Sequence, residues 1–255
     1  MNQIEQQMLV AERLLGSLFK TANPLSLILS GPPGFGKTTL VRKVCEAYRI
    51  PWSPIRASAK GLVENLFGLY QYGNTSPLIF DDYDQVFTDP ALLEIFKIIL
   101  DSHDLRILSN QVSGPNRIDP FPVKNAVVFL TNRDLRNPKH FPARVWQTDI
   151  PALRDRSTII QIPFDQDMVL SYTLTLAPTI LRAVKIKDER KLDLCLSRVK
   201  MVEIIDHLRT NPDRYHEISP RIISKLGKLR LAVPDVDVWH SIREGQLRAS
   251  QKDAA

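Results

Sequence analysis

The chain of 255 residues is long enough for one sizeable domain and a smaller appended one, because domains commonly hold roughly 100–200 residues. Its 44% of apolar and 24% of charged residues are typical of globular proteins and exclude a chain that is disordered throughout. The net charge of +6 is compatible with a nucleic-acid partner, but basic residues alternate with acidic ones, as in residues 185–191, which favours an ordinary solvated surface.

Strands and helices are expected to alternate in the first 164 residues. The apolar spacing over residues 3–20 predicts a leading amphipathic helix, and helical patterns are clear at Lys37–Tyr48 and Pro90–Leu100. Short apolar runs predict five strands, at Leu25–Leu29, Trp52–Ala57, Leu78–Phe80, Ala126–Thr131 and Thr158–Ile162. This alternation predicts an α/β fold, an αβα sandwich around a mostly parallel five-stranded sheet.

The pattern changes after Phe164, where helical spacing continues and no convincing strand is found. Helices are expected near residues 166–176, 179–184, 189–209 and 219–232. They predict a small α-helical C-terminal domain, with Ile162–Phe164 as the hinge. The expected boundaries are residues 1–164 for the α/β domain with its leading helix, 165–232 for the helical domain, and 233–255 for a C-terminal helix and tail.

A phosphate-binding loop is predicted between the first strand and the following helix. The run GPPGFGKT at residues 31–38 matches the P-loop pattern GxxxxGK[ST], in which glycines let backbone N–H groups approach phosphate oxygens. Lys37 is expected to reach the β and γ phosphates of ATP, and the Thr38 hydroxyl to bind Mg²⁺. The predicted nucleotide-binding residues are Gly31, Pro32, Pro33, Gly34, Phe35, Gly36, Lys37, Thr38 and Thr39.

Paired carboxylates follow the apolar strand at residues 78–80. Asp81 is expected to bind Mg²⁺ beside Thr38, usually through water, and Asp82 to face the water that attacks the γ-phosphate. Asp84 is the alternative base, and a third interpretation is that the aspartates only cap the next segment. ATP and Mg²⁺ are therefore the predicted cofactors, and ATP hydrolysis the predicted reaction.

These motifs, in this order, resemble those of the AAA+ family of ring-forming P-loop ATPases. Residues 127–132 (VVFLTN) resemble the sensor 1 strand, which implies that Asn132 helps to hold the attacking water. The sequence departs from the commonest family pattern at Asp82, where most members have glutamate. Aspartate is one methylene shorter, so a slower hydrolysis is an open alternative.

Two arginines complete the resemblance. Residues 151–162 resemble the helix end and final strand that carry the arginine finger, which implies that Arg156, or else Arg154, acts on the nucleotide of a neighbouring subunit. Residues 218–226 resemble the sensor 2 helix of the lid domain, which implies a contact from Arg221 to the γ-phosphate. A surface role for each arginine is the alternative. The implied catalytic residues are Lys37, Asp82, Asn132, Arg156 and Arg221.

The resemblance implies a homo-oligomer, most commonly a hexameric ring, that hydrolyses Mg-ATP at subunit interfaces to remodel or load a protein or nucleic-acid partner. An assembly switch or scaffold with slow hydrolysis is the alternative function. The Asp-Asp-x-Asp run at residues 81–84 is similar to that of some AAA+-like proteins of tailed bacteriophages, which implies a viral origin.

Two segments are candidates for contact with that partner. Residues 59–73 lie where AAA+ remodellers place a substrate-gripping loop, although the same apolar positions suit the core face of a helix. Residues 106–124 predict an inserted hairpin with a turn at Gly114–Asn116, where Arg106, Arg117 and Lys124 would meet phosphates if the partner is nucleic acid.

The sequence also predicts a cytoplasmic location, in the host cytoplasm if the protein is viral. Cys45 and Cys195 lack the spacing of a zinc site or a disulfide framework. The polar N-terminus is unlike a secretion signal. No apolar run approaches the roughly 18–20 residues needed to cross a bilayer, so no membrane partner is expected.

Overall fold

The computed structural model describes residues 2–20, 25–101, 106–109, 117–187, 193–212, 219–233 and 239. The chain divides into two compact units. The first holds Met1–Pro32 and Gly36–Ile162, and the second holds Pro33–Phe35 and Pro163–Ala255. Three residues of the P-loop segment therefore group with the second unit. The domain boundaries at residues 164 and 232 stay predictions.

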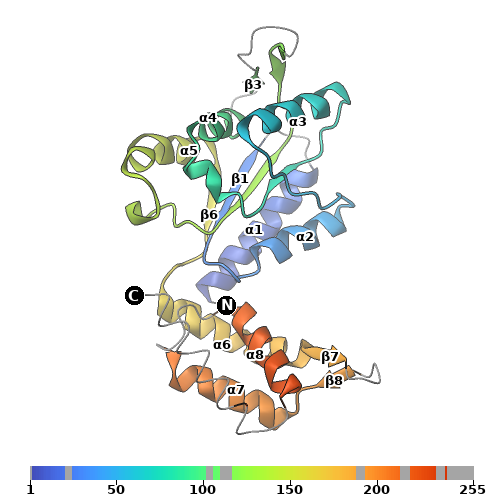
Figure 1. The fold of residues 1–255 in the computed structure, drawn as a ribbon, viewed down its shortest axis with the longest axis vertical. Coiled ribbons are helices and arrows are strands. Elements are labelled where there is room, and N and C mark those ends of the chain that lie inside the picture. The colour runs from blue at the N-terminus through green and yellow to red at the C-terminus, as the bar shows by residue number, and fades with distance from the viewer. Residues whose placement is uncertain are drawn as a thin grey trace. The chain divides into compact units, whose positions relative to one another are not determined.

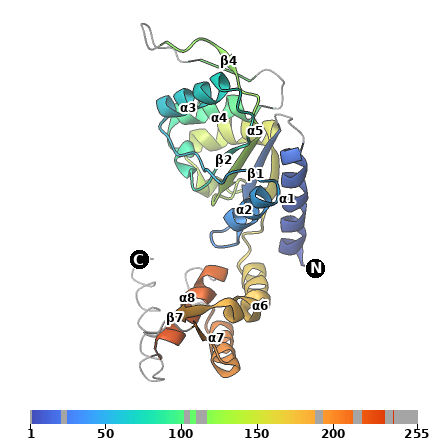
Figure 2. The same cartoon turned by 90° about the vertical axis from the view of Figure 1, so that its right-hand side faces the viewer.

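A parallel sheet forms the centre of the first unit (Figures 1 and 2). Its strands are β1 (Ser26–Ser30), β2 (Leu78–Phe80), β5 (Val127–Thr131) and β6 (Thr158–Gln161), in the spatial order β2-β5-β1-β6. All three strand pairs are parallel. Every residue of β1, β2 and β5 is buried, as expected for strands covered by helices on both faces. The predicted αβα architecture is confirmed.

The fifth predicted strand, Trp52–Ala57, is not found, so the described sheet has four strands. The segment runs beside β2, where the Ile55 N–H donates to the Ile79 carbonyl at 2.7 Å. Pro51 and Pro54 carry no backbone N–H and cannot donate to a ladder of hydrogen bonds. An apolar run interrupted by prolines therefore follows the sheet edge without becoming a strand.

The helices of the first unit cover both faces of the sheet. They are α1 (Gln3–Lys20), α2 (Lys37–Ala47), α3 (Ala59–Gln71), α4 (Pro90–Ile99) and α5 (Ile150–Arg156). Shorter helical turns occur at Asp84–Phe87, Pro138–His140 and Val145–Asp149. Helices α1 and α2 lie together on one face, and α3, α4 and α5 group on the other (Figure 2). The Asp89 side chain caps α4 by accepting from the amides of Ala91 and Leu92, and Pro90 occupies the first turn.

The predicted hairpin is confirmed at its base, and its turn at residues 114–116 lies outside the described residues. Strand β3 (Ile107–Leu108) pairs antiparallel with β4 (Phe121–Pro122). Arg106 precedes β3 and is only 1% exposed, so the expectation that it meets phosphates is wrong. Its guanidinium donates to the carbonyls of Asp101 (2.6 Å) and Asn125 (3.0 Å) and to Ser26 Oγ (3.1 Å). Burial lowers the pKa of Arg106 to about 10, so the group stays cationic at neutral pH.

Replacing Arg106 by methionine is expected to destabilise the first unit by about 2–4 kcal/mol, because it leaves two carbonyls and a hydroxyl buried without this donor. Arg117→Met is the matched control in the same hairpin. Arg117 is exposed and pairs with Asp119 at 3.3 Å, so its loss should change stability by less than about 0.5 kcal/mol. Urea unfolding measures both, and equal midpoints for the two variants would contradict the anchoring role of Arg106.

Residues 59–71 form a helix, α3, and not a loop. Leu62 is buried, and the Phe67 ring packs against Phe121 of the hairpin with centroids 5.3 Å apart. Phe67 is therefore part of the core face, which was the alternative interpretation of this segment. Tyr72, just after the helix, is 90% exposed. A role of this segment in gripping a partner stays a prediction.

The second unit contains helices α6 (Gln166–Ala183), α7 (Arg198–Thr210) and α8 (Pro220–Ala232). It also contains a hairpin of β7 (Lys185–Lys187) and β8 (Asp193–Cys195), so the expectation of an entirely helical domain is wrong. Each strand has three residues with a single aliphatic one, too short for a strand pattern to be seen in the sequence. Helix α7 begins only at Arg198, because Ser197 caps it by accepting from the Lys200 amide.

Candidate nucleotide site

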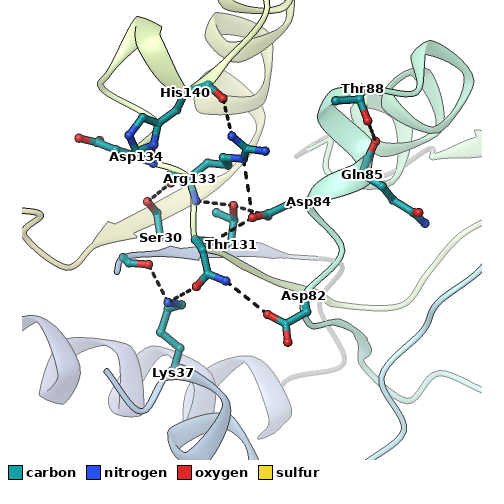
Figure 3. A network of polar contacts seen from close by, with 12 residues as sticks. Ser30, Lys37, Asp82, Asp84, Gln85, Thr88, Thr131, Arg133, Asp134 and His140 are labelled. Atoms are coloured by element: carbon teal, nitrogen blue, oxygen red, sulfur yellow. Dashed lines mark hydrogen bonds and ion pairs between the residues drawn. The ribbon is translucent and has the colours of Figure 1, made fainter. Parts of the chain in front are cut away.

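Three chain segments meet at one edge of the sheet of the first unit. The P-loop follows β1, the aspartates follow β2, and Asn132 follows β5. Ser30 lies opposite Thr131 and Phe80 opposite Phe129, so these strands end close together. In open α/β sheets ligands bind outside the carboxyl ends of the parallel strands, and this edge is therefore the candidate site (Figure 3).

The Lys37 ammonium is held at the start of α2. Lys37 is 7% exposed, and its Nζ donates to the carbonyls of Gly31 (2.7 Å) and Pro32 (2.8 Å) and to Asn132 Oδ1 (2.9 Å). Gly36 precedes it with φ +80°, a conformation that side-chain-bearing residues rarely adopt. The arrangement places a cation beside the N–H groups at the N-terminus of α2, which together favour a bound anion.

Thr38 and Asp81 form the pair of oxygen ligands that the metal hypothesis requires. Thr38 Oγ1 lies 3.1 and 3.0 Å from the two Asp81 carboxylate oxygens. Desolvation raises the pKa of Asp81 and outweighs the opposing Thr38 hydrogen bond, and the charge of Asp82 raises it further. A divalent cation would favour the ionised carboxylate. Hydroxyl and carboxylate oxygens suit Mg²⁺, which keeps its remaining positions for phosphates and water.

Asp82 turns its carboxylate toward Asn132. Its φ of +52° is unusual for a residue with a side chain, and such backbone conformations cluster at functional sites. Asn132 Nδ2 lies 3.4 Å from Asp82 Oδ1, while Asn132 Oδ1 accepts from Lys37. One amide therefore connects the P-loop cation to an Asp82 side chain that is 66% exposed.

Asp84 occupies a different environment from Asp82, because its carboxylate is bound to the end of β5. Its Oδ1 accepts from Thr131 Oγ1 at 2.6 Å (Figure 3). Its Oδ2 accepts from the Asn132 N–H at 3.3 Å. The Arg133 guanidinium lies 3.9 Å from the same Oδ2. Both oxygens of Asp84 are thus engaged by the strand that carries Asn132, whereas Asp82 faces solvent.

Two further arginines of this edge, Arg56 and Arg133, were not selected from the sequence. Arg56 pairs with Asp82 at 4.0 Å, with both side chains mostly exposed. The carbonyl of Arg133 accepts from Ser30 Oγ at 2.7 Å, and its guanidinium donates to the His140 carbonyl at 3.3 Å. Arg133 could have been selected from the sequence, because it directly follows Asn132. No sequence motif near Arg56 links it to the site, because Arg56 lies 26 positions before Asp82 in the chain.

The two arginine-finger candidates are bonded within the first unit. Arg156 donates to the Lys97 carbonyl at 2.6 Å and pairs with Asp101 at 3.5 Å, so it satisfies a carbonyl at the C-terminus of α4. Arg154 donates to the Leu135 carbonyl. Neither the choice between them nor an action on a neighbouring subunit is tested by these contacts, and both stay predictions.

Arg221 lies in the second unit, at the second residue of α8, with its side chain exposed. Pro220 occupies the first turn of that helix, as expected. A contact from Arg221 to the γ-phosphate stays a prediction, as does nucleotide binding by the P-loop residues Pro33–Phe35, which group with the same unit.

The parallel sheet and the site at its edge define a P-loop nucleotide-binding domain of the αβα class. Residues 27–104 match the family described as "ATPase family associated with various cellular activities (AAA)". This match covers β1, the P-loop, α2, β2 and the aspartates. Within residues 27–104 the chain is therefore similar to the AAA family of ATPases.

Comparisons with other known proteins are more distant. No curated protein sequence matches the chain. Among solved structures, it is similar to the replication initiator DnaA bound to AMPPCP and single-stranded DNA, with TM-score 0.49 and 15% identity over 94% of this chain and 63% of that one. It is also similar to the DnaC helicase loader, with TM-score 0.38 and 16% identity over 64% of this chain and 92% of that one.

A third similar structure is RuvB of Thermotoga maritima, with TM-score 0.43 and 16% identity over 85% of this chain and 59% of that one. The chain thus spans about three fifths of the length of DnaA and RuvB. At these identities and TM-scores, none of the three proteins' activities is assigned to this chain. Across the described residues, no helix is both long and apolar enough to span a membrane.

Proposed function

We propose that the protein binds and hydrolyses Mg-ATP as a subunit of a ring-like homo-oligomer, with six subunits as the expected number. The energy of hydrolysis would remodel or load a protein or nucleic-acid partner. The observation that carries this proposal is the hydrogen-bonded series Lys37–Asn132–Asp82, beside the Thr38–Asp81 pair. A P-loop cation, a polar strand end and a carboxylate are the parts that phosphoryl transfer to water requires.

The same side chains would act in sequence when ATP binds. Phosphate oxygens would replace the carbonyls that Lys37 now contacts, and its charge would stabilise the β and γ phosphates. Thr38 and Asp81 would hold Mg²⁺, which would supply further positive charge to the phosphates when bound. Asn132, released from Lys37, would orient water, and Asp82 would accept its proton.

The surroundings of the two carboxylates favour Asp82 over Asp84 as the base. A general base needs an accessible oxygen within hydrogen-bond reach of the attacking water. Asp82 is exposed and faces the Asn132 amide. Both carboxylate oxygens of Asp84 already contact Thr131, Asn132 and Arg133. Asp84 therefore acts as a positioning residue that orients the end of β5.

Asp84→Asn is expected to keep ATP affinity and lower turnover by about tenfold, because it loosens Asn132 without removing the base. Thr131→Val, which deletes the hydroxyl donor to the same carboxylate, should have a similar effect. Asp82→Asn should lose about 10²–10⁴ in rate. Steady-state turnover and ATP affinity of the three variants separate the roles, because only loss of the base should stop hydrolysis while ATP is still bound. Asp84 would be the base if Asp84→Asn stopped turnover and Asp82→Asn retained it.

A slow assembly switch is the second candidate function. The observation that favours it is the position of Arg156, whose guanidinium is bonded to Lys97 and Asp101 of its own subunit. ATP hydrolysis would then require that Arg156 first leave its contacts with Lys97 and Asp101. In this form the protein would retain ATP in the ring and turn it over rarely.

One experiment tests the proposed function and distinguishes an ATPase motor from a slow assembly switch. ATP turnover and oligomer mass are measured for the purified chain with Mg²⁺, alone and with single-stranded DNA, duplex DNA, RNA or an unfolded polypeptide. A motor is expected to turn over repeatedly and to be stimulated by its polymer. A switch is expected to retain one ATP per subunit in a stable oligomer. A monomer that neither binds nor hydrolyses ATP would refute both.

A further inference from the structure

A groove of about 550 Å³ runs between α1 and α2 of the first unit, and the proposed function does not use it. It is lined along one face of α1 and by the C-terminal half of α2 with the residue that follows. The lining residues are Leu9, Glu12, Arg13, Gly16, Ser17, Lys20, Lys43, Val44, Ala47 and Tyr48. Those on α2 begin six residues after Lys37, beyond the P-loop end of the helix.

The floor of the groove is shaped by Gly16 and Tyr48. A Cβ at position 16 would lie 3.0 Å from the Tyr48 hydroxyl oxygen, so the missing side chain lets the tyrosine sit against the α1 backbone. Phe19 meets the edge of the same ring, with centroids 6.2 Å apart. Val44 is buried and Leu9 half-buried on either side. An elongated apolar floor therefore lies between two helices.

The walls of the groove carry excess positive charge. Glu12 is neutralised by Lys43, whose Nζ lies 2.9 Å from its carboxylate. Within the described part of the chain, Arg13 and Lys20 have no carboxylate partner. Lys20 lies over the Tyr48 ring, 5.9 Å from its centroid. The groove thus presents two cations available to an anionic ligand.

Exposed aliphatic residues extend the apolar surface along α1. Val10 is 45% exposed and Leu14 39% exposed. At 100° per residue they lie beside Ser17 and Arg13 on the helix surface, so they form an apolar rim next to the cationic wall. A ligand with one apolar face and one acidic face would complement the apolar floor and the cationic wall of the groove.

We propose that the α1–α2 groove binds an acidic amphipathic helix of a partner protein. The α1 residues that line it, from Leu9 to Lys20, span about 16 Å at 1.5 Å per residue, which corresponds to about three helical turns. A helix laid between α1 and α2 would bury its apolar stripe on Tyr48, Val44 and Leu9 and place carboxylates beside Arg13 and Lys20. Nucleic acid fits less well, because its binding depends on many phosphate contacts, whereas the groove offers two cations that lack a carboxylate partner among the described residues, over an apolar floor.

The test uses the full chain and a fluorescein-labelled helical peptide of about 15 residues, with leucines on one face and glutamates on the other. Controls are a scrambled peptide of the same composition, a peptide with lysine in place of each glutamate, and single-stranded DNA. Fluorescence anisotropy is expected to show salt-sensitive binding of the acidic amphipathic peptide, at least about tenfold tighter than any control. Lys37→Ala should bind it as the wild type does, which separates this proposal from the ATPase function.

Charge reversal tests the position of the site. Arg13→Glu with Lys20→Glu is expected to weaken peptide binding at least about tenfold, whereas Lys60→Glu on the exposed face of α3 should leave it unchanged. Retained ATP binding by each variant shows that the domain is folded. The proposal is overturned if the acidic peptide binds no better than its scrambled control or if the charge-reversed variant binds it equally well. It is also overturned if single-stranded DNA displaces the acidic peptide. The same holds if the Arg13→Glu, Lys20→Glu variant loses self-association of the chain but still binds the peptide as the wild type does.

Discussion

Lys37→Ala is expected to lower ATP affinity by about 10²–10⁴-fold. The ammonium would make charge-assisted contacts with the β and γ phosphates, and each such bond contributes about 1.5–3 kcal/mol. Two of them correspond to this loss, since every 1.4 kcal/mol is about tenfold in affinity. Isothermal titration with a non-hydrolysable ATP analogue in the presence of Mg²⁺ measures the change.

Lys43→Ala is the matched control for this prediction, because Lys43 lies on the same helix and its partner is the exposed Glu12. Its ATP affinity should equal that of the wild type. Lys37 also binds the carbonyls of Gly31 and Pro32, so thermal unfolding is recorded for both variants to show that the first unit remains folded. A folded Lys37→Ala variant with wild-type affinity would contradict the P-loop assignment.

Mixing two inactive variants is expected to restore ATP turnover if Arg156 acts on the neighbouring subunit. Arg156→Ala should bind ATP yet hydrolyse it about 10³–10⁵-fold more slowly, the range for an arginine supplied in trans. Asp82→Asn should also be inactive but keeps its arginine. In a mixed ring, an Arg156→Ala subunit supplies Asp82 and an Asp82→Asn neighbour supplies Arg156. Such an interface is complete, so part of the wild-type rate should return.

Arg154→Ala is the control, since it removes the alternative arginine two positions earlier. Recovery with Arg154→Ala in place of Arg156→Ala would assign the role to Arg154. Subunit exchange is verified by the mass of mixed oligomers, and thermal unfolding shows whether loss of the Lys97 and Asp101 contacts disrupts α4 and α5. If mixed oligomers form without any recovery, Arg156 serves only within its own subunit.

Features that depend on neighbouring residues in the chain could be predicted from the amino-acid sequence alone. A GPPGFGKT run between an apolar strand and a helix specifies a P-loop, because its glycine conformations and its lysine act together over eight positions. Apolar runs ending in Asp81 and Asn132 were enough to predict β2 and β5, whose parallel pairing brings their ends together. Caps such as Asp89–Pro90 placed α4 to within one residue.

Contacts between polar residues that are far apart in the chain could not be predicted from the sequence and required the folded structure. The sequence predicted Asp82 as the base with Asp84 as the alternative, and the different surroundings of the two carboxylates lie in contacts to Thr131 and Asn132, nearly fifty positions away. Arg106 looked like a surface cation, and only folding places its guanidinium among carbonyls and a hydroxyl from three other segments. The burial of a polar group and its pairing with distant residues depend on how the whole chain folds, whereas a sequence motif involves only residues that are close together in the chain.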